Sequence, residues 1–266
     1  MSPAGDFDYE RGGTGYALRR RPDPSIAALV RRALGESRTV VNVGAGAGSY
    51  EPEDLDVTAV EPSAMMRSQR RSDRPALDAI AEDLPFEDAT FDAALASVTV
   101  HQWSNRDQGL REMRRVSRGP VVLLTFDPDA LDRFWLAHYA PELIEAERAR
   151  YPTLEHIAQV LGGDTEVIEV RIPRACTDGF TEAFYARPEA FLDDDVRRSQ
   201  SAWSFVTAEV ATASVEALRH DLASGEWDRR FGELRGWPSF VGSLRLLVNY
   251  PADDRPGKTE SPFPST

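Results

Sequence analysis

The sequence predicts an α/β fold in which a mostly parallel sheet is covered by helices on both faces. Short apolar runs rich in Val, Ala and Leu alternate along the chain with amphipathic stretches of helical period. Such nearly continuous runs are typical of parallel strands, which are buried on both faces. A glycine-rich segment follows the first run at residues 44–48, as in open sheets that bind ligands at the carboxyl ends of their strands.

Seven segments are expected to form the strands of one sheet. Most are short, partly β-branched runs that end at a glycine, a proline or a charged residue, which is the usual signature of a strand and its stop. They span residues 39–43, 56–61, 79–81, 91–98, 120–126, 165–172 and 239–250.

Helices are expected between these strands, over residues 24–34, 62–71, 105–117, 131–150 and 153–161. Asp23 followed by Pro24 predicts an N-cap and first turn for the first of them. The match Ser104-x-x-Asp107 predicts a capping box with Ser104 as the N-cap of the 105–117 helix.

A single domain is expected over residues 1–250. Residues 1–22 are rich in Gly and Arg and precede the first helix. Residues from about 176 to 237 are Trp-rich and mainly helical, so they are expected to form a helical cap inserted before the last strand. The tail, residues 251–266, has four prolines and few apolar residues, which predicts disorder.

The charge and cysteine content exclude several classes of protein. The 266 residues carry 44 acidic and 31 basic side chains, a formal charge of −13. This argues against nucleic acid or an anionic membrane as a partner, because no basic excess is present to neutralise phosphates. The single cysteine, Cys176, can form no internal disulfide, and no Cys/His set has metal spacing. Without a signal-peptide pattern or an apolar run of about 18 residues, a cytoplasmic protein is expected.

The glycine-rich segment reads Gly44-x-Gly46-x-Gly48, and Glu61 ends the next predicted strand. Glycines at such a turn let the backbone approach a ligand closely. Ser49 stands where a dinucleotide fingerprint would have its last glycine, and no Lys-Ser/Thr pair completes a P-loop. A carboxylate at the position of Glu61 can accept hydrogen bonds from both hydroxyls of a ribose. The two features together predict a ribose-bearing ligand; a plain turn and a solvated acid are the alternatives for each alone.

Four segments then stand in a distinctive order. They read VNVGAGAGSYEP, AVEPSAMM, AEDLPFEDATFDAAL, and ASVTVHQW followed by GLREMRRVSRGP. In this order they resemble the class I S-adenosylmethionine-dependent methyltransferases that act on small molecules, of the type 11 kind. The resemblance covers about residues 38–126. It implies a Rossmann-like seven-stranded sheet, S-adenosylmethionine as the cofactor, and transfer of its methyl group to a small-molecule acceptor in specialised metabolism.

Carried over position by position, the resemblance implies a set of cofactor contacts. They are Tyr16, Arg20, Gly44, Ala45, Gly46, Gly48, Glu61, Pro62, Met66, Ala81, Glu82, Asp83, Ser97 and Val98. Glu61 would hold the ribose hydroxyls and Met66 would pack on the adenine, while residues 1–22 would cover the cofactor. The sequence departs from the family pattern at two positions: Asn42 and Ile80 stand where members of the family commonly have an acidic residue.

His101 is the candidate catalytic base. It follows the fourth predicted strand on the side where ligands bind, and its neutral imidazole could take a proton near pH 7. A structural hydrogen-bonding role is the alternative. The aromatic candidates for the substrate pocket are Trp103, Phe180, Tyr185 and Trp203. For each of these, packing in a hydrophobic core is the alternative.

Two other functions are compatible with the same sheet. A nicotinamide-dependent oxidoreductase is disfavoured by the serine at position 49. A protein that binds S-adenosylmethionine without methylating, as a scaffold or for another reaction, stays open because a fold does not fix a function.

Overall fold

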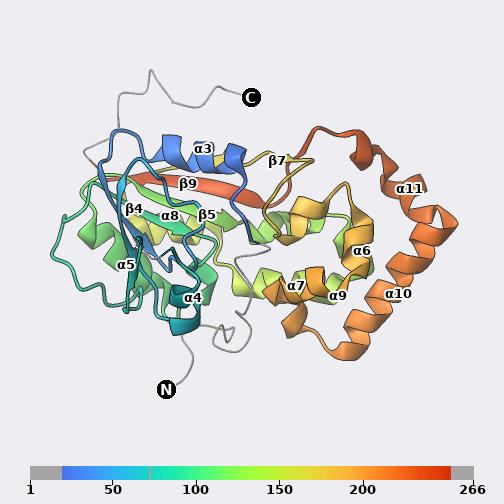
Figure 1. Cartoon of the computed structure of the whole chain (residues 1–266). Helices are drawn as coiled ribbons and strands as arrows, with labels where there is room; N and C mark the ends of the chain where they lie inside the picture. The colour runs from blue at the N-terminus through green and yellow to red at the C-terminus, as the bar shows by residue number, and fades with distance from the viewer. Residues whose placement is uncertain (1–19, 72, 253–266) are drawn as a thin grey trace.

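The computed structural model describes residues 20–71 and 73–252. Its main sheet has seven strands in the order β3-β2-β1-β4-β5-β9-β6 and lies on one side of the molecule, opposite α10 and α11 (Figure 1). The strands are β1 (Thr39–Val43), β2 (Asp56–Val60), β3 (Ala76–Leu77), β4 (Ala93–Ser97), β5 (Val121–Phe126), β6 (Asp164–Glu169) and β9 (Leu244–Tyr250). The first five pair in parallel, and β9 runs antiparallel to both β5 and β6. The mostly parallel α/β fold predicted from the sequence is confirmed. Tyr16 and residues 253–266 of the expected tail lie outside the described residues.

The two faces of the sheet are covered by different helices. Val40 belongs to a buried cluster with Ile26 and Val30 of α3 (Pro24–Ala33). Its neighbour Val41 belongs to the opposite cluster, with residues of α5 (Arg106–Val116) and α8 (Leu154–Leu161). Successive side chains of a strand point to opposite faces, so one apolar run supplies both cores.

Helix starts follow local capping chemistry, with one correction. Asp23 caps α3 as predicted, its side chain accepting from the backbone N–H of Ser25. The N-cap of α5 is Asn105, whose side chain accepts from Gln108 N, and not Ser104. The reason is that Glu82 accepts the backbone N–H of Asn105 at 2.8 Å and holds this residue at the start of the helix.

The structure divides one predicted helix into three shorter ones. The helix expected over 131–150 is divided into η2 (Pro128–Arg133), α6 (Leu136–Tyr139) and α7 (Pro141–Arg150). Ala140 precedes Pro141 and has φ −135° and ψ 61°, because a proline disfavours helical geometry in the residue before it.

The third strand and the last strand also differ from the expectation. β3 forms at residues 76–77 rather than 79–81, where it can pair with Ala59 and Val60 of β2. The last strand is divided into β8 (Ser239–Phe240), which pairs with β7 (Ile172–Pro173), and β9. The helix expected over 62–71 is the shorter α4 (Ala64–Ser68).

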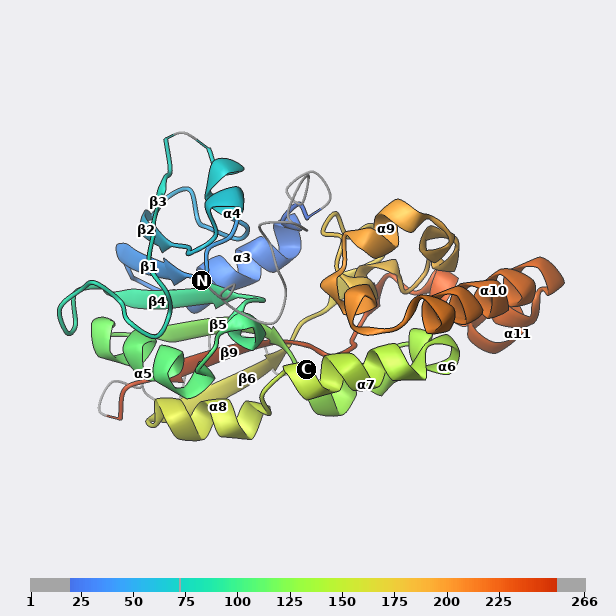
Figure 2. The same cartoon turned by 90° about the horizontal axis from the view of Figure 1, so that it is seen from below.

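The segment between β7 and β8 is built from short helices, and residues 176–237 are called the cap below. The helices are η3 (Thr181–Phe184), η4 (Pro188–Leu192), α9 (Asp194–Arg198), η5 (Ser201–Phe205), α10 (Ala208–Ser224), α11 (Glu226–Phe231) and η6 (Gly232–Gly236). Figure 2 shows α9, α10 and α11 gathered with α6 and α7 on one side of the molecule, away from α5 and α8. The ring of Trp135 packs edge-on against Trp227 at 5.6 Å and Phe191 at 5.5 Å, so residues before the cap share its core.

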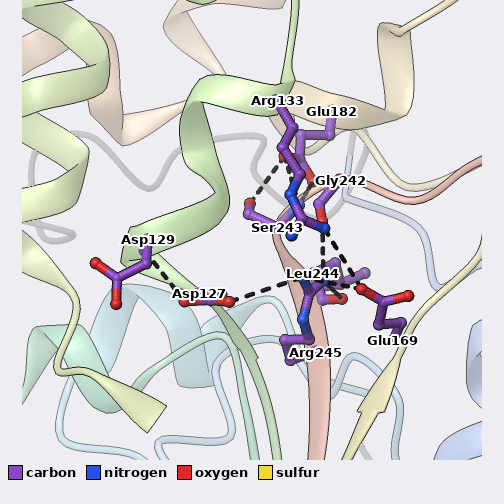
Figure 3. Close-up of polar contacts among 9 residues, drawn as sticks. All are labelled: Asp127, Asp129, Arg133, Glu169, Glu182, Gly242, Ser243, Leu244 and Arg245. Carbon is purple, nitrogen blue, oxygen red and sulfur yellow. Dashed lines mark hydrogen bonds and ion pairs between the residues drawn. The ribbon is translucent and has the colours of Figure 1, made fainter.

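A buried carboxylate anchors the cap to the sheet (Figure 3). Glu182 of η3 accepts from the backbone N–H of Ser243 at 2.9 Å and from its hydroxyl at 2.8 Å, just before β9 begins. A Cβ on Gly242 would lie 2.5 Å from this carboxylate, so only glycine fits there without a shift. Burial is the main cause that raises the pKa of Glu182 to about 7.

Candidate active site

The loop that leaves β1 has left-handed backbone geometry at its three glycines. The φ angles are 66° at Gly44, 52° at Gly46 and 94° at Gly48. A Cβ on Gly44 would lie 2.2 Å from the hydroxyl oxygen of Thr99, which follows β4. A Cβ on Gly46 would lie 3.3 Å from the methyl carbon of Met66 on α4. The loop therefore packs closely against the exit of β4 and the start of α4, and side chains would fill the space between them.

Glu61 stands directly after β2 and faces this loop. Its Oε2 accepts the backbone N–H of Gly46 and its Oε1 accepts that of Ser63, both at 2.8 Å. The residue is only 8% exposed, and burial raises the pKa of its carboxyl although the two N–H groups oppose the shift. Each carboxylate oxygen can accept more than one hydrogen bond. Glu61 thus has capacity left for a pair of vicinal hydroxyls.

Several buried polar atoms around the carboxyl edge of the sheet lack a hydrogen-bond partner among the described residues. They are Asn42 Oδ1 on β1, Ser97 Oγ at the end of β4, His101 Nδ1 and Gln102 Oε1. Buried polar groups are normally paired, so a group of unpaired atoms at one edge fits a polar ligand. Val98 lies between them with φ 50°, a costly conformation for a β-branched residue that is typical of functional sites.

The remaining cofactor candidates lie along the same edge. Met66 is buried on α4, and Ala81 is buried between β3 and β4. The Pro62 carbonyl accepts from Arg67, and the Glu82 carboxylate is engaged with Asn105. Ala45, in the glycine loop, is buried and its backbone N–H donates to the carbonyl of Val60. Asp83, which follows Glu82, is exposed.

A buried ion pair supports the glycine loop, which the sequence did not reveal. Arg70 donates to both carboxylate oxygens of Glu51 at 2.8 Å and to the carbonyl of Gly46 at 3.2 Å. Asn42 donates its amide N–H to the same Glu51 carboxylate at 2.9 Å. The Asn42 position, where the family often has an acid, is thus joined to an acid from the following loop. No local pattern connects residues 51 and 70, so sequence reasoning had no signal for the pair.

A cavity of about 40 Å³ lies where the exits of β4 and β5 meet the cap. Its lining residues are Arg20, Val98, His101, Phe126, Glu147, Tyr151, Phe180, Thr181, Gln200, Ser201 and Ala202. Four of the residues singled out from the sequence meet here, namely Arg20, Val98, His101 and Phe180. The others come from β5, α7 and the cap and were not anticipated.

The other three aromatic pocket candidates lie elsewhere. Trp103 covers Gly109, where a Cβ would lie 2.5 Å from its ring, in the core on the α5 face of the sheet. Tyr185 stacks on Phe240 and donates its hydroxyl to the Trp237 carbonyl. Trp203 packs against the main core. Trp103 and Tyr185 therefore pack in a hydrophobic core, and Trp203, which is partly buried, packs against one.

His101 is 4% exposed and its ring lies 4.4 Å from that of Tyr151. Burial holds the pKa of the imidazole well below its usual value, and the charges of Arg150, Arg106 and Arg20 lower it further. The ring is therefore neutral at physiological pH. Titration near pH 7, on which the expected role as a base relied, does not apply to this buried ring.

Asp178 joins three separate segments beside the cavity. Its carboxylate accepts from Arg20 Nε at 2.6 Å and from the Tyr50 hydroxyl at 2.8 Å. Burial, followed by the Asp178 charge, raises the pKa of Tyr50, so the phenol stays a donor. Because Tyr50 ends the glycine loop and Arg20 lines the cavity, one carboxylate of the cap connects both parts of the site.

Comparison with known proteins agrees with this geometry. A family profile described as "Methyltransferase domain" matches residues 41–124. A solved structure from Anabaena variabilis ATCC 29413, described as a methyltransferase from an antibiotic biosynthesis pathway, is 30% identical, with a TM-score of 0.81. The match covers 87% of this chain and 98% of that one.

Two curated relatives are also similar to part of this chain. A malonyl-[acyl-carrier protein] O-methyltransferase from Pseudescherichia vulneris is 30% identical over 53% of this chain. A ubiquinone/menaquinone biosynthesis C-methyltransferase from Geobacter sp. (strain M21) is 33% identical over 37% of this chain. The chain spans about half the length of these relatives, 57% and 41% respectively. Within residues 20–71 and 73–252, no helix is long and apolar enough to cross a membrane.

Proposed function

The chain belongs to the class I S-adenosylmethionine-dependent methyltransferases, and from this premise we propose that it methylates a small molecule bound between the sheet and the cap. The observation that supports this most is that the glycine loop and the cavity under the cap adjoin each other at the exit of β4. The glycine loop contacts the exit of β4, and that exit lines the cavity under the cap. A ligand held by Glu61 and the loop would thus end beside His101.

The residues present fit S-adenosylmethionine. Glu61 has lone pairs for the ribose hydroxyls, and the absence of a side chain at Gly46, where a Cβ would lie 3.3 Å from Met66, lets the backbone approach the ligand. Met66 offers a soft apolar surface for an adenine ring. The Ser97 hydroxyl and the side-chain amide oxygen of Asn42 have no partner among the described residues. Both can accept hydrogen bonds, so they suit the amino group at the methionine end of the cofactor. Arg20 would border the same end, where it lines the cavity.

S-adenosylmethionine, when bound, supplies a methyl group that its sulfonium has already activated. The protein therefore has to orient an acceptor and exclude water, more than it has to supply reactive groups. Phe126, Phe180 and Tyr151 form apolar walls around the cavity, and these exclude water. Neutral His101 adds a ring nitrogen without adding a positive charge that would repel the sulfonium.

Calorimetric titration with S-adenosylhomocysteine tests the cofactor site. Glu61→Ala removes the ribose acceptor, and hydrogen bonds to a charged group contribute about 1.5–3 kcal/mol each. We expect at least a tenfold loss of affinity. Glu61→Gln, which keeps the volume, guards against a folding defect and should show an intermediate loss.

Glu53→Ala is the matched control, because this exposed acid lies near the same loop and pairs only with exposed Arg71 among the described residues. It should bind S-adenosylhomocysteine like the wild type. Unchanged affinity in both folded Glu61 variants would remove this residue from the cofactor site.

A further inference from the structure

Two buried polar groups on residues that line the cavity have no partner in the part of the chain that the structure describes. One is the amide nitrogen Nε2 of Gln200, a residue only 5% exposed, and the other is Nδ1 of His101. The oxygen of the Gln200 amide accepts the hydroxyl of Thr181 at 2.9 Å. This bond orients the amide, so that its NH₂ group is the side left for a ligand.

The hydrogen-bond partner of the His101 ring determines whether Nδ1 is a donor or an acceptor. Nε2 of the ring lies 2.7 Å from the amide nitrogen of Gln102. An amide nitrogen can only donate, so Nε2 accepts and the ring hydrogen of the neutral imidazole stands on Nδ1. Two of the residues that line the cavity, Gln200 and His101, therefore carry buried N–H donors without a partner among the described residues.

The charges around these donors favour a negative ligand. Three guanidinium groups, those of Arg150, Arg106 and Arg20, act on the His101 ring. Two carboxylates offset part of this charge, since Glu147 pairs with Arg150 and Asp178 pairs with Arg20. Within residues 20–71 and 73–252, three positive charges thus stand against two negative ones, and an excess of positive charge attracts anions.

The size and walls of the cavity restrict the ligand further. A volume of about 40 Å³ holds roughly three water-sized groups, at 10–15 Å³ for each. A carboxylate has three heavy atoms. The rings of Phe126 and Phe180 lie 5.8 Å apart and those of Phe126 and Tyr151 5.5 Å apart, so an apolar body next to the carboxylate would meet aromatic surface.

From these donors, the charge balance and the size of the cavity, we propose that the methyl acceptor is a carboxylate and that Gln200 is the residue that specifies it. This inference rests on the proposed function. A carboxylate oxygen forms the new bond to the methyl carbon while the carbon–sulfur bond breaks and its electron pair returns to sulfur. The products are a methyl ester and S-adenosylhomocysteine. Both charges are cancelled and no proton leaves, so the reaction needs no base.

The test uses three probes with one phenyl body: benzoate, benzyl alcohol and benzylamine. Their binding to the full chain saturated with S-adenosylhomocysteine is measured by saturation-transfer NMR. We expect benzoate to bind at least fivefold more tightly than the other two. Gln200→Leu should weaken benzoate at least fivefold, because a charge-assisted hydrogen bond is lost, without changing affinity for S-adenosylhomocysteine.

Gln200→Glu should change the order of affinity among the three probes, which a purely structural role of Gln200 would leave unchanged. It replaces the donor with an acceptor of the same shape, so the preference should invert toward benzylamine. Gln159→Leu is the matched control, since this exposed glutamine on α8 contacts Glu155 and should leave all three probes unaffected.

The outcomes separate the two proposals. If S-adenosylhomocysteine fails to bind the wild type, the proposed function falls and the acceptor class falls with it. If it binds but benzoate shows no saturable binding, or benzyl alcohol or benzylamine binds as well as benzoate, only the carboxylate assignment is overturned. Tighter binding of benzyl alcohol would indicate the other tautomer of His101, with an acceptor nitrogen in the cavity. Benzoate binding that survives both Gln200 variants would remove this residue from acceptor recognition.

Discussion

Glu182→Gln tests whether the buried carboxylate under the cap makes the stability of the fold depend on pH. Burial is the main cause that raises the pKa of this group from 4.5 to about 7, against the opposing hydrogen bonds of Ser243 and the charge of Arg245. The folded protein therefore keeps a proton that the unfolded chain releases between about pH 4.5 and 7. Over that window the folded state binds more protons, so the free energy of unfolding falls as the pH rises.

The structure gives the size of this effect. The separation between 4.5 and about 7 corresponds to a loss of about 3 kcal/mol across the window, at about 1.4 kcal/mol for each pH unit. Glutamine at this position is neutral throughout and can still accept a hydrogen bond from Ser243 through its carbonyl oxygen. The variant should therefore lose this slope and keep the fold.

Urea unfolding at about pH 5 and about pH 8 measures the effect in both proteins. The stability of the wild type should fall by about 2.5 kcal/mol more than that of the variant, because a small part of the loss lies below pH 5. Glu155→Gln is the control, because this acid is exposed on α8, and it should follow the wild type. If wild type and Glu182→Gln lose stability in parallel, the carboxylate is not protonated in the fold and the argument from burial is refuted.

Two further predictions concern the glycine loop. Gly46→Val should abolish S-adenosylhomocysteine binding, because it adds a side chain at φ 52° and 3.3 Å from Met66. Gly35→Val has a similar φ of 56° in open space, so it controls for strain alone, and an equal thermal shift by the ligand in both variants would contradict the steric argument. Arg70→Met should cost about 3–5 kcal/mol of stability in urea unfolding, because it leaves buried Glu51 without its ion pair. Adding Glu51→Gln should recover part of that loss, and no recovery would show that the pair is not the cause.

The cofactor half of the site could be predicted from the sequence because its signals are local. Gly44, Gly46 and Glu61 each stand at the end of a strand, and the parallel pairing of β1 with β2 brings strand ends together at one edge. Capping works in the same way for Asp23, whose side chain accepts from the backbone N–H groups of Ser25 and Ile26, two and three residues further along the chain. Ser104 and Asn105 are both possible N-caps for α5. A contact with a residue distant in the sequence, the hydrogen bond from Asn105 N to Glu82, favours Asn105.

The acceptor half could not be predicted in this way. Gln200 becomes relevant only because Thr181 orients its amide and β4 places His101 opposite. Neither the segment of Thr181 nor that of Gln200 has a motif, and it is the packing of the cap that brings these two residues together. The aromatic candidates show the same limit: Phe180 lines the cavity whereas Tyr185, five residues later, is buried in the core. Composition alone cannot separate these positions, because both bury a large apolar ring.

The two halves of the site are consequently fixed by different kinds of interaction. Backbone hydrogen bonds of the sheet hold the loop and Glu61, and these cannot change without changing the register of the strands. The cap is joined to the sheet by side-chain contacts: its apolar residues share the main core with β5 and β9, and Glu182 and Asp178 form buried hydrogen bonds with Ser243 and Tyr50. Substitutions inside the cavity can therefore alter which acceptor is recognised while the cofactor half stays intact. Gln200 lies on the cap side of this division, so its variants should change the preferred probe without changing the affinity for S-adenosylhomocysteine.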